Sequence, residues 1–70
     1  MNHSLDEAQR SLQVANRAMT ELNLALTAFQ VNCQRSEWEE AARERLRMSA
    51  AIDSYADAFA SAYRFFHAAR

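Results

Sequence analysis

Residues 5–33 read LDEAQRSLQVANRAMTELNLALTAFQVNC, and an apolar side chain recurs there at alternating steps of three and four residues. The positions in this series are Leu5, Ala8, Leu12, Ala15, Met19, Leu22, Leu26, Phe29 and Cys33. This spacing places the whole series on one face of an α-helix, and it is typical of the seam of a left-handed coiled coil. We therefore expect a long helix over about residues 5–32, whose seam packs against the rest of the chain.

The composition favours helix throughout the 70 residues. The chain contains no glycine and no proline. These two residues are the strongest helix breakers, at about 1 and 3 kcal/mol relative to alanine in a helix interior, and most tight turns between strands also need them. Their absence, together with many Ala, Leu, Glu, Gln and Arg residues, predicts an all-α fold.

A second helix is expected to begin shortly after the first one ends. Ser36 followed by Glu39 has the spacing of a capping box, as has Ser4 followed by Glu7 at the start of the chain. The seam of the first helix also loses its register beyond Cys33, in a short polar stretch. We therefore predict a turn at about residues 33–36 and a second helix at about 37–69.

The expected architecture is a single domain over residues 1–70, formed by an antiparallel two-helix hairpin. Two such hairpins could dimerise into a four-helix bundle. The apolar row of the second helix recurs at strict sevens, and we expect it to face the seam of the first helix, with Leu12 opposite Phe59 and Met19 opposite Ile52. The members of this row are Trp38, Arg45, Ile52, Phe59 and Phe66.

Several side chains do not fit inside such a hairpin, and they are our candidates for binding a protein partner. On the first helix, Leu24 and Val31 continue a row that begins with two arginines, so they should form an apolar patch near the turn, with Trp38 close by. The second helix is apolar over more of its circumference than one partner helix can cover. Arg45 is a charge within an apolar row, where it can specify a register or a partner. The predicted partner-binding residues are Leu24, Val31, Trp38, Arg45, Leu46, Tyr63 and Phe65.

No pattern for catalysis or for cofactor binding is present, so we predict a protein that is not an enzyme, with no cofactor and no metal. A single cysteine excludes an internal disulfide, and the two histidines stand at opposite ends of the chain. The formal charge is -1, and we do not expect a nucleic-acid partner. Without an apolar run or a signal peptide, we expect no membrane contact and a cytoplasmic location. No small-molecule substrate is indicated.

In size and layout the chain resembles small phage-encoded antagonists such as helical anti-CRISPR proteins. That resemblance implies a bacterial or phage protein that inhibits a larger assembly by occupying one of its subunit surfaces. The layout is also similar to the two-helix co-chaperones of type III secretion needle subunits, which implies a chaperone role instead. A third hypothesis is an RNA-binding hairpin dimer. In every case a protein partner, self-association as a homodimer, or both are expected.

Overall fold

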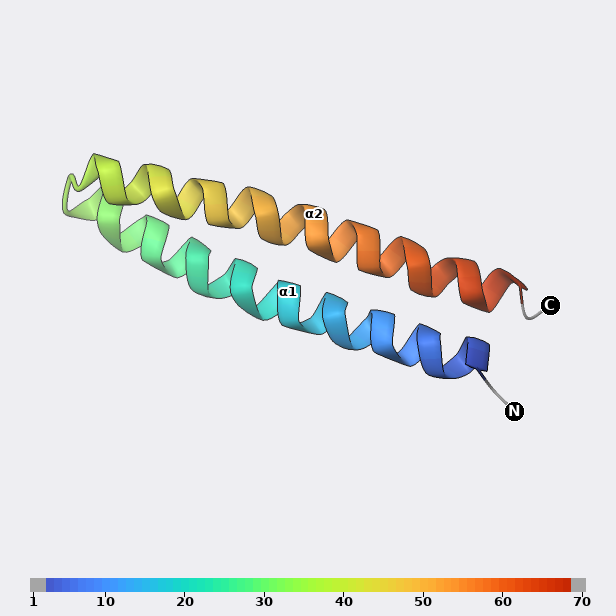
Figure 1. Cartoon of the computed structure of the whole chain (residues 1–70). Helices are drawn as coiled ribbons and strands as arrows, with labels where there is room; N and C mark the ends of the chain where they lie inside the picture. Colours follow the sequence, from blue (N-terminus) through green and yellow to red (C-terminus); the bar gives the residue numbers. More distant parts are fainter. Residues whose placement is uncertain (1–2, 69–70) are drawn as a thin grey trace.

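The computed structural model describes residues 3–68, with side chains described for residues 5–65 and for His67. It contains two helices, α1 (His3–Gln34) and α2 (Trp38–Ala68). They run antiparallel and pack against each other along their whole length (Figure 1). The Cα atoms extend over 53 × 13 × 12 Å. The predicted all-α hairpin is therefore confirmed, and the turn lies at residues 35–37. The predicted end of the second helix, residue 69, lies outside the described residues.

The turn is built from backbone hydrogen bonds that close the end of α1. The amide of Ser36 donates to the carbonyl of Cys33 at 3.1 Å, and the amide of Glu37 donates to the carbonyl of Asn32 at 2.8 Å. Ser36 has a φ of 57°. A left-handed residue with this pair of hydrogen bonds is the Schellman motif, which satisfies carbonyls that the helix end leaves unpaired. The chain can thus reverse within three residues without a glycine.

This geometry corrects the prediction that Ser36 caps the second helix. The first hydrogen bond of α2 runs from the amide of Ala41 to the carbonyl of Glu37, at 2.9 Å, so Glu37 is the N-cap residue. Ser36 belongs to the end of α1. The start of α1 is also two residues earlier than predicted, because the helix begins at His3 and Ser4 lies inside its first turn.

The positive φ of Ser36 leads to a test of the turn. The left-handed conformation costs a residue with a Cβ roughly 1–2 kcal/mol, whereas glycine adopts it freely. Part of that gain is lost because glycine also makes the unfolded chain more flexible. We expect Ser36→Gly to raise the free energy of unfolding by up to about 1 kcal/mol, and Ser36→Val to lower it, as measured by urea unfolding. A less stable Ser36→Gly variant together with a more stable Ser36→Val variant would contradict this turn geometry.

The core between the helices is made of alanine. In the part of the chain that the structure describes, every fully buried side chain of the core is an alanine methyl group. We call this set the alanine seam: Ala8, Ala15, Ala18 and Ala25 of α1, and Ala41, Ala51, Ala58 and Ala62 of α2. Such small side chains let two helix backbones approach closely. Leu22, Phe29, Met48 and Tyr55 are half-buried within the same rows.

The predicted seam is therefore half right. Its alternate members Ala8, Ala15, Leu22 and Phe29 do face α2, but Leu5, Met19 and Leu26 are exposed and Leu12 is only half-buried. The second buried row of α1 is instead the row of Ser11, Ala18, Ala25 and Asn32, so the contact is rotated around the helix axis from the one predicted.

The prediction of the core row on α2 was wrong, because the described residues of that row do not lie between the helices. Ile52 is 52% exposed and Phe59 48% exposed. The side chain of Phe66 lies outside the described residues. The buried positions of α2 are those of Ala41, Ala51, Ala58 and Ala62. The large apolar side chains of both helices thus lie beside the seam and leave much of their surface open to solvent.

Candidate protein-binding face

One side of the hairpin carries a shallow groove between the helices, in which alanine and valine side chains lie between charged and hydroxyl side chains. Its walls come from the residues that lie four positions before the seam alanines, such as Val14 and Glu21 of α1 and Arg47 and Ser54 of α2. A second hollow continues along the same side. Its lining is Ser11, Val14, Ser54, Asp57, Ala58 and Ser61. We call this side the polar side.

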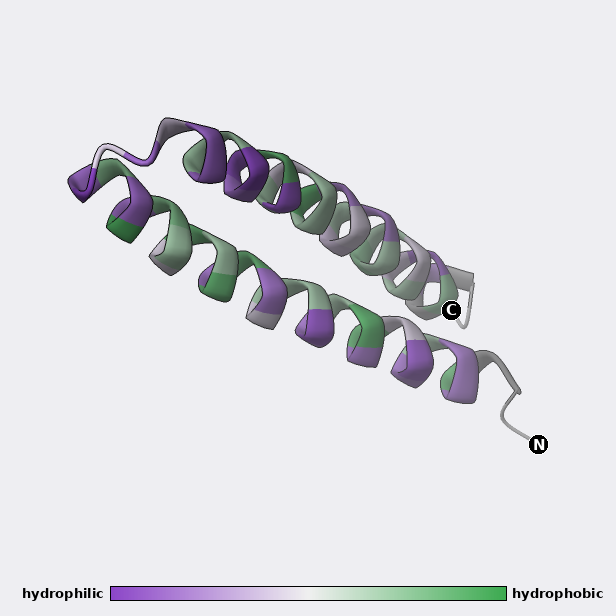
Figure 2. Ribbon diagram, turned by 60° about the vertical axis from the view of Figure 1, so that its left-hand side comes forward, coloured by the Kyte–Doolittle hydropathy of each residue, from purple (hydrophilic) through white to green (hydrophobic). Residues whose placement is uncertain are grey.

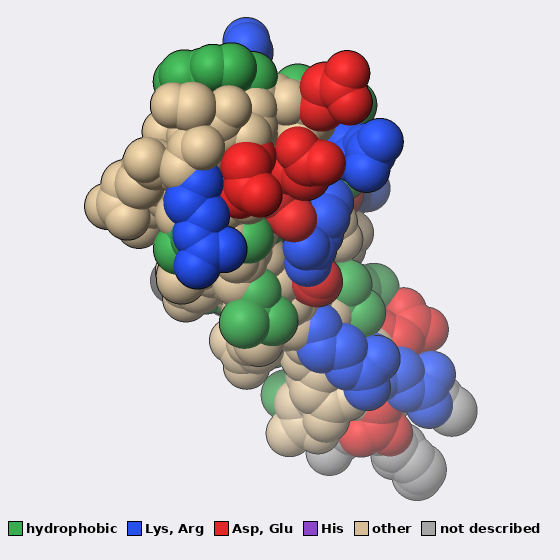
Figure 3. Space-filling model, turned by 90° about the vertical axis from the view of Figure 1, so that its left-hand side faces the viewer, with side chains coloured by type: hydrophobic (Ala, Val, Ile, Leu, Met, Phe, Trp, Pro, Cys, Tyr) green, Lys and Arg blue, Asp and Glu red, His purple; other side chains and the backbone are tan. Residues whose placement is uncertain are grey.

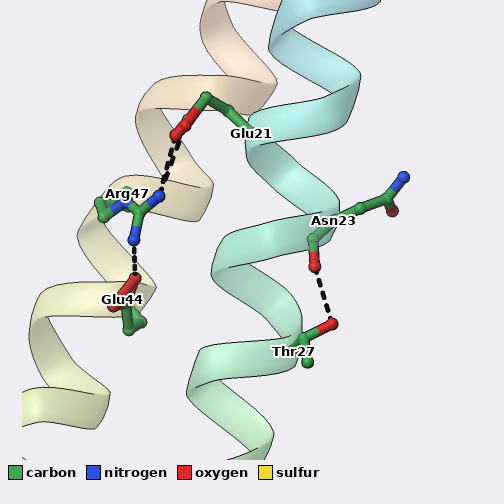
Figure 4. Close-up of polar contacts among 5 residues, drawn as sticks. All are labelled: Glu21, Asn23, Thr27, Glu44 and Arg47. Atoms are coloured by element: carbon green, nitrogen blue, oxygen red, sulfur yellow. Dashed lines mark hydrogen bonds and ion pairs between the residues drawn. The ribbon is translucent and has the colours of Figure 1, made fainter.

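The polar side is closed by an ion pair between the helices (Figure 4). Arg47 donates to the carboxylate of Glu21 across the groove at 2.8 Å and to Glu44 of its own helix at 2.6 Å. Hydrogen bonding to Glu21, followed by the charge of Glu44, raises the pKa of Arg47 above its usual value. The pair with Glu44 joins residues three positions apart on α2, whereas the bridge to Glu21 shows which rows of the two helices meet here.

The outward surfaces are also polar in large part. Thr27 donates its hydroxyl to the backbone carbonyl of Asn23 at 3.0 Å, and Thr20 does the same to Asn16 at 3.1 Å. Viewed from the turn end, acidic and basic side chains lie next to one another in a band along the hairpin (Figure 3). Mixed charges of this kind are typical of a solvated surface rather than of a site for one ion.

The opposite side of the hairpin is apolar. Leu12 and Met19 stand four positions after Ala8 and Ala15 of α1, and Phe59 stands four positions after Tyr55 of α2. The rows that stand four positions before the seam residues meet across the polar groove. In an antiparallel pair of helices, the rows that stand four positions after the seam residues must therefore meet on the opposite side. Hydrophobic and hydrophilic residues alternate along both helices, as in amphipathic helices (Figure 2).

We call this second side the apolar face. Its side chains recur at sevens on each helix and remain substantially open to solvent, with Trp38 at 65% and Met19 at 38% exposed. The ring of Phe59 stacks on that of Tyr55, with centroids 5.9 Å apart, which fixes its direction. The members of the apolar face are Leu5, Leu12, Met19 and Leu26 of α1 and Trp38, Ile52 and Phe59 of α2.

Arg45 is the charged residue of the apolar face, because it stands between Trp38 and Ile52 in their row. The structure places it on the surface, exposed. Arg45 therefore does not lie inside the hairpin core. Whether a partner uses it stays a prediction.

The other predicted binding residues are spread over different surfaces. Leu24 is 59% and Leu46 71% exposed, and both point away from the seam on the outer surfaces of their helices. Tyr63 is exposed on α2, where its ring contacts that of His67 edge-on, with the ring centroids 4.3 Å apart. Phe65 is half-buried, in the row of Ala51 and Ala58.

The structure does not bring Leu24 and Val31 to the same side as Trp38. They continue the helical row of Arg17, which borders the polar groove, whereas Trp38 continues the row of Ile52 on the apolar face. The expected apolar patch at the turn is therefore divided between two sides of the hairpin, with Trp38 on the larger one.

Other kinds of site are not apparent in the described part of the chain. Among residues 3–68 there is no group of three or more His, Cys, Asp or Glu side chains that could hold a metal ion. Cys33 is half-buried and carries a free thiol. Neither α1 nor α2, as far as the structure describes them, is long and apolar enough to cross a membrane.

Comparisons of the chain with protein families, with curated proteins and with solved structures find no match.

Proposed function

We propose that this chain is a non-enzymatic protein-binding hairpin, and that its apolar face is the binding surface. The observation that supports the proposal is the separation of large from small apolar side chains. Alanine fills the space between the helices, while leucine, isoleucine, phenylalanine and tryptophan line one outer side. A cluster of large exposed apolar side chains on one side marks an interaction surface.

The shape of the molecule supports the same proposal. The two helices pack along the alanine seam into a rod whose apolar side chains project at intervals of seven residues. Helices bind protein grooves through anchors at this kind of spacing. Trp38 and Phe59 are the largest anchors, and aromatic side chains dominate the energetics of protein interfaces.

Within this class, we propose a small antagonist of bacterial or phage origin that covers a subunit surface of a larger assembly. A rod without catalytic groups acts by occupancy, one copy for each surface that it covers. The Cα atoms of the hairpin extend over 53 × 13 Å on one side. A standard protein interface buries about 800 Å² on each partner, so one side of the hairpin is of the size needed to cover the contact surface of a subunit.

Site-specific photo-cross-linking in the native cells tests the proposal. A photoreactive phenylalanine analogue at Phe59 should give one discrete protein adduct in high yield. The matched control is the same analogue at Ala50, which is exposed on the polar side and should give little or none. Equal yields from both positions, or no adduct from Phe59, would contradict binding through the apolar face.

A further inference from the structure

The hairpin exposes more surface than a compact protein of the same mass. Its accessible surface is 5483 Å², whereas a compact monomer of 8.0 kDa exposes about 4,450 Å². The excess is about 1,000 Å². A standard protein interface buries about 800 Å² on each partner. One interface along the apolar face would therefore bring the chain to the exposed area expected of a stable folded protein.

The alanine seam also leaves the isolated hairpin with little stabilisation. A buried methyl group contributes roughly 0.8 kcal/mol, compared with about 1.5–3 kcal/mol for a fully buried Leu, Ile or Phe side chain. In the described part of the chain no large side chain is fully buried. The side chains able to supply that missing burial are those of the apolar face.

From these observations we propose that the apolar face is covered by a second copy of this chain, in a four-helix bundle whose two turns lie at opposite ends. This inference rests on the proposed role of the apolar face as a protein-binding surface, and it names the occupant of that face in the isolated chain, which a subunit of the larger assembly then replaces. Both rows of the face repeat at sevens over the same length of helix. Two copies can therefore stack row on row with the geometry of a four-helix bundle.

The position of Arg45 selects the orientation of the two copies. If both turns lay at the same end, the two Arg45 side chains would stand at one level of the bundle, on diagonally opposite helices, and repel each other. With the turns at opposite ends and a two-fold axis near Ile52, the two arginines are 14 residues apart along the bundle, which is about 21 Å. Each then lies across from Phe59 of the partner subunit, where a guanidinium can stack on the ring.

In this arrangement α1 packs on α1 of the other copy, and α2 on α2. Met19 and Ile52 lie close to the two-fold axis, because they stand near the middle of α1 and α2. Each of them therefore contacts the same residue of the other copy. Leu12 of one chain is paired with Leu26 of the other, since both are seven residues from Met19.

Sedimentation equilibrium of the full chain tests whether the occupant is a second copy. We expect a species of twice the 8.0 kDa chain mass at micromolar concentration. A folded, helical monomer at 100-fold higher concentration would overturn this inference. That result would leave the proposed function standing, because the apolar face would then be free for a different protein, which the photo-cross-linking at Phe59 identifies.

Cysteine cross-linking tests which face the two copies share, in a background in which Cys33→Ser removes the natural thiol. Met19→Cys should be joined to its counterpart by a short bismaleimide in high yield, as a covalent dimer. The matched control is Val14→Cys, at a position of similar exposure on the polar side, which should give no covalent dimer. Equal cross-linking at both positions, or cross-linking at Val14 alone, would overturn the proposed bundle.

Discussion

Replacing Ala25 by leucine is expected to lower the free energy of unfolding by about 1–3 kcal/mol, although the change adds apolar surface. The side chain of Ala25 is 0% exposed, in the row of Ala18 that faces α2. An isobutyl group at this position must push the helices apart or adopt a strained rotamer, because the seam holds only methyl groups. The expected fall in Tm is about 4–8 °C for each kcal/mol in a domain of this size.

The matched control is Ala60→Leu, which makes the same chemical change at an exposed position of α2. It should change the free energy of unfolding by less than about 0.5 kcal/mol. Circular dichroism of both variants at one protein concentration provides the comparison. If Ala25→Leu were as stable as Ala60→Leu, the helices would not be in contact along the alanine seam.

The second large effect is expected for Ile52→Glu, on the apolar face. Its carboxylate would be buried without a partner in the protein interface, at a cost of about 3–5 kcal/mol. That cost corresponds to a dissociation constant raised by roughly a hundredfold or more. Since association stabilises the fold by mass action, the Tm of the variant should also fall and lose its dependence on protein concentration.

Leu46→Glu is the control for this substitution. Leu46 is 71% exposed and lies on the outer surface of α2, away from both the seam and the apolar face. Its replacement should leave the concentration dependence of the Tm unchanged. The measurement is a series of thermal unfolding curves over a wide range of protein concentration. Identical behaviour of the two variants would contradict a specific role for the apolar face.

The sequence was sufficient to predict the helices and their antiparallel arrangement, because both depend on local properties. The absence of glycine and proline favoured helix, and the loss of register after Cys33 located the turn. The Schellman motif at Ser36 was missed, since glycine is the residue that usually adopts this conformation. The sequence pattern of a serine followed by Glu39 indicated a helix start instead.

The direction of the seam could not be predicted from hydrophobicity. Leu12 and Met19 are more apolar than Ala18 and Ala25. A search for the most apolar stripe therefore selects the row of Leu12 and Met19 and misses the row of Ala18 and Ala25. The contact between two close helices is decided by how near their backbones can approach, which favours alanine. A signal was present, because both helices carry alanines at positions seven residues apart, such as Ala18 with Ala25 and Ala51 with Ala58.

The preference for alanine at the helix contact also explains why the binding residues could be predicted only in part. Trp38 and Arg45 were selected because they stood out from their surroundings, and the structure places both on the apolar face. Ile52 and Phe59 were assigned to the core, because their spacing at sevens is also the spacing of a core row. Periodicity identifies a face of a helix, but it does not distinguish the face that meets the other helix of the hairpin from one left open to solvent.

The most direct test of this account is a methyl nuclear Overhauser spectrum of the labelled chain. The alanine seam predicts cross-peaks between the methyl groups of α1 and α2, and strongest among them the contact of Ala18 with Ala51, which line the same groove. If Ala18 and Ala51 gave no cross-peak, the large side chains would have to hold the hairpin together. The apolar face would then be its core, which would contradict both the fold and the binding surface described above.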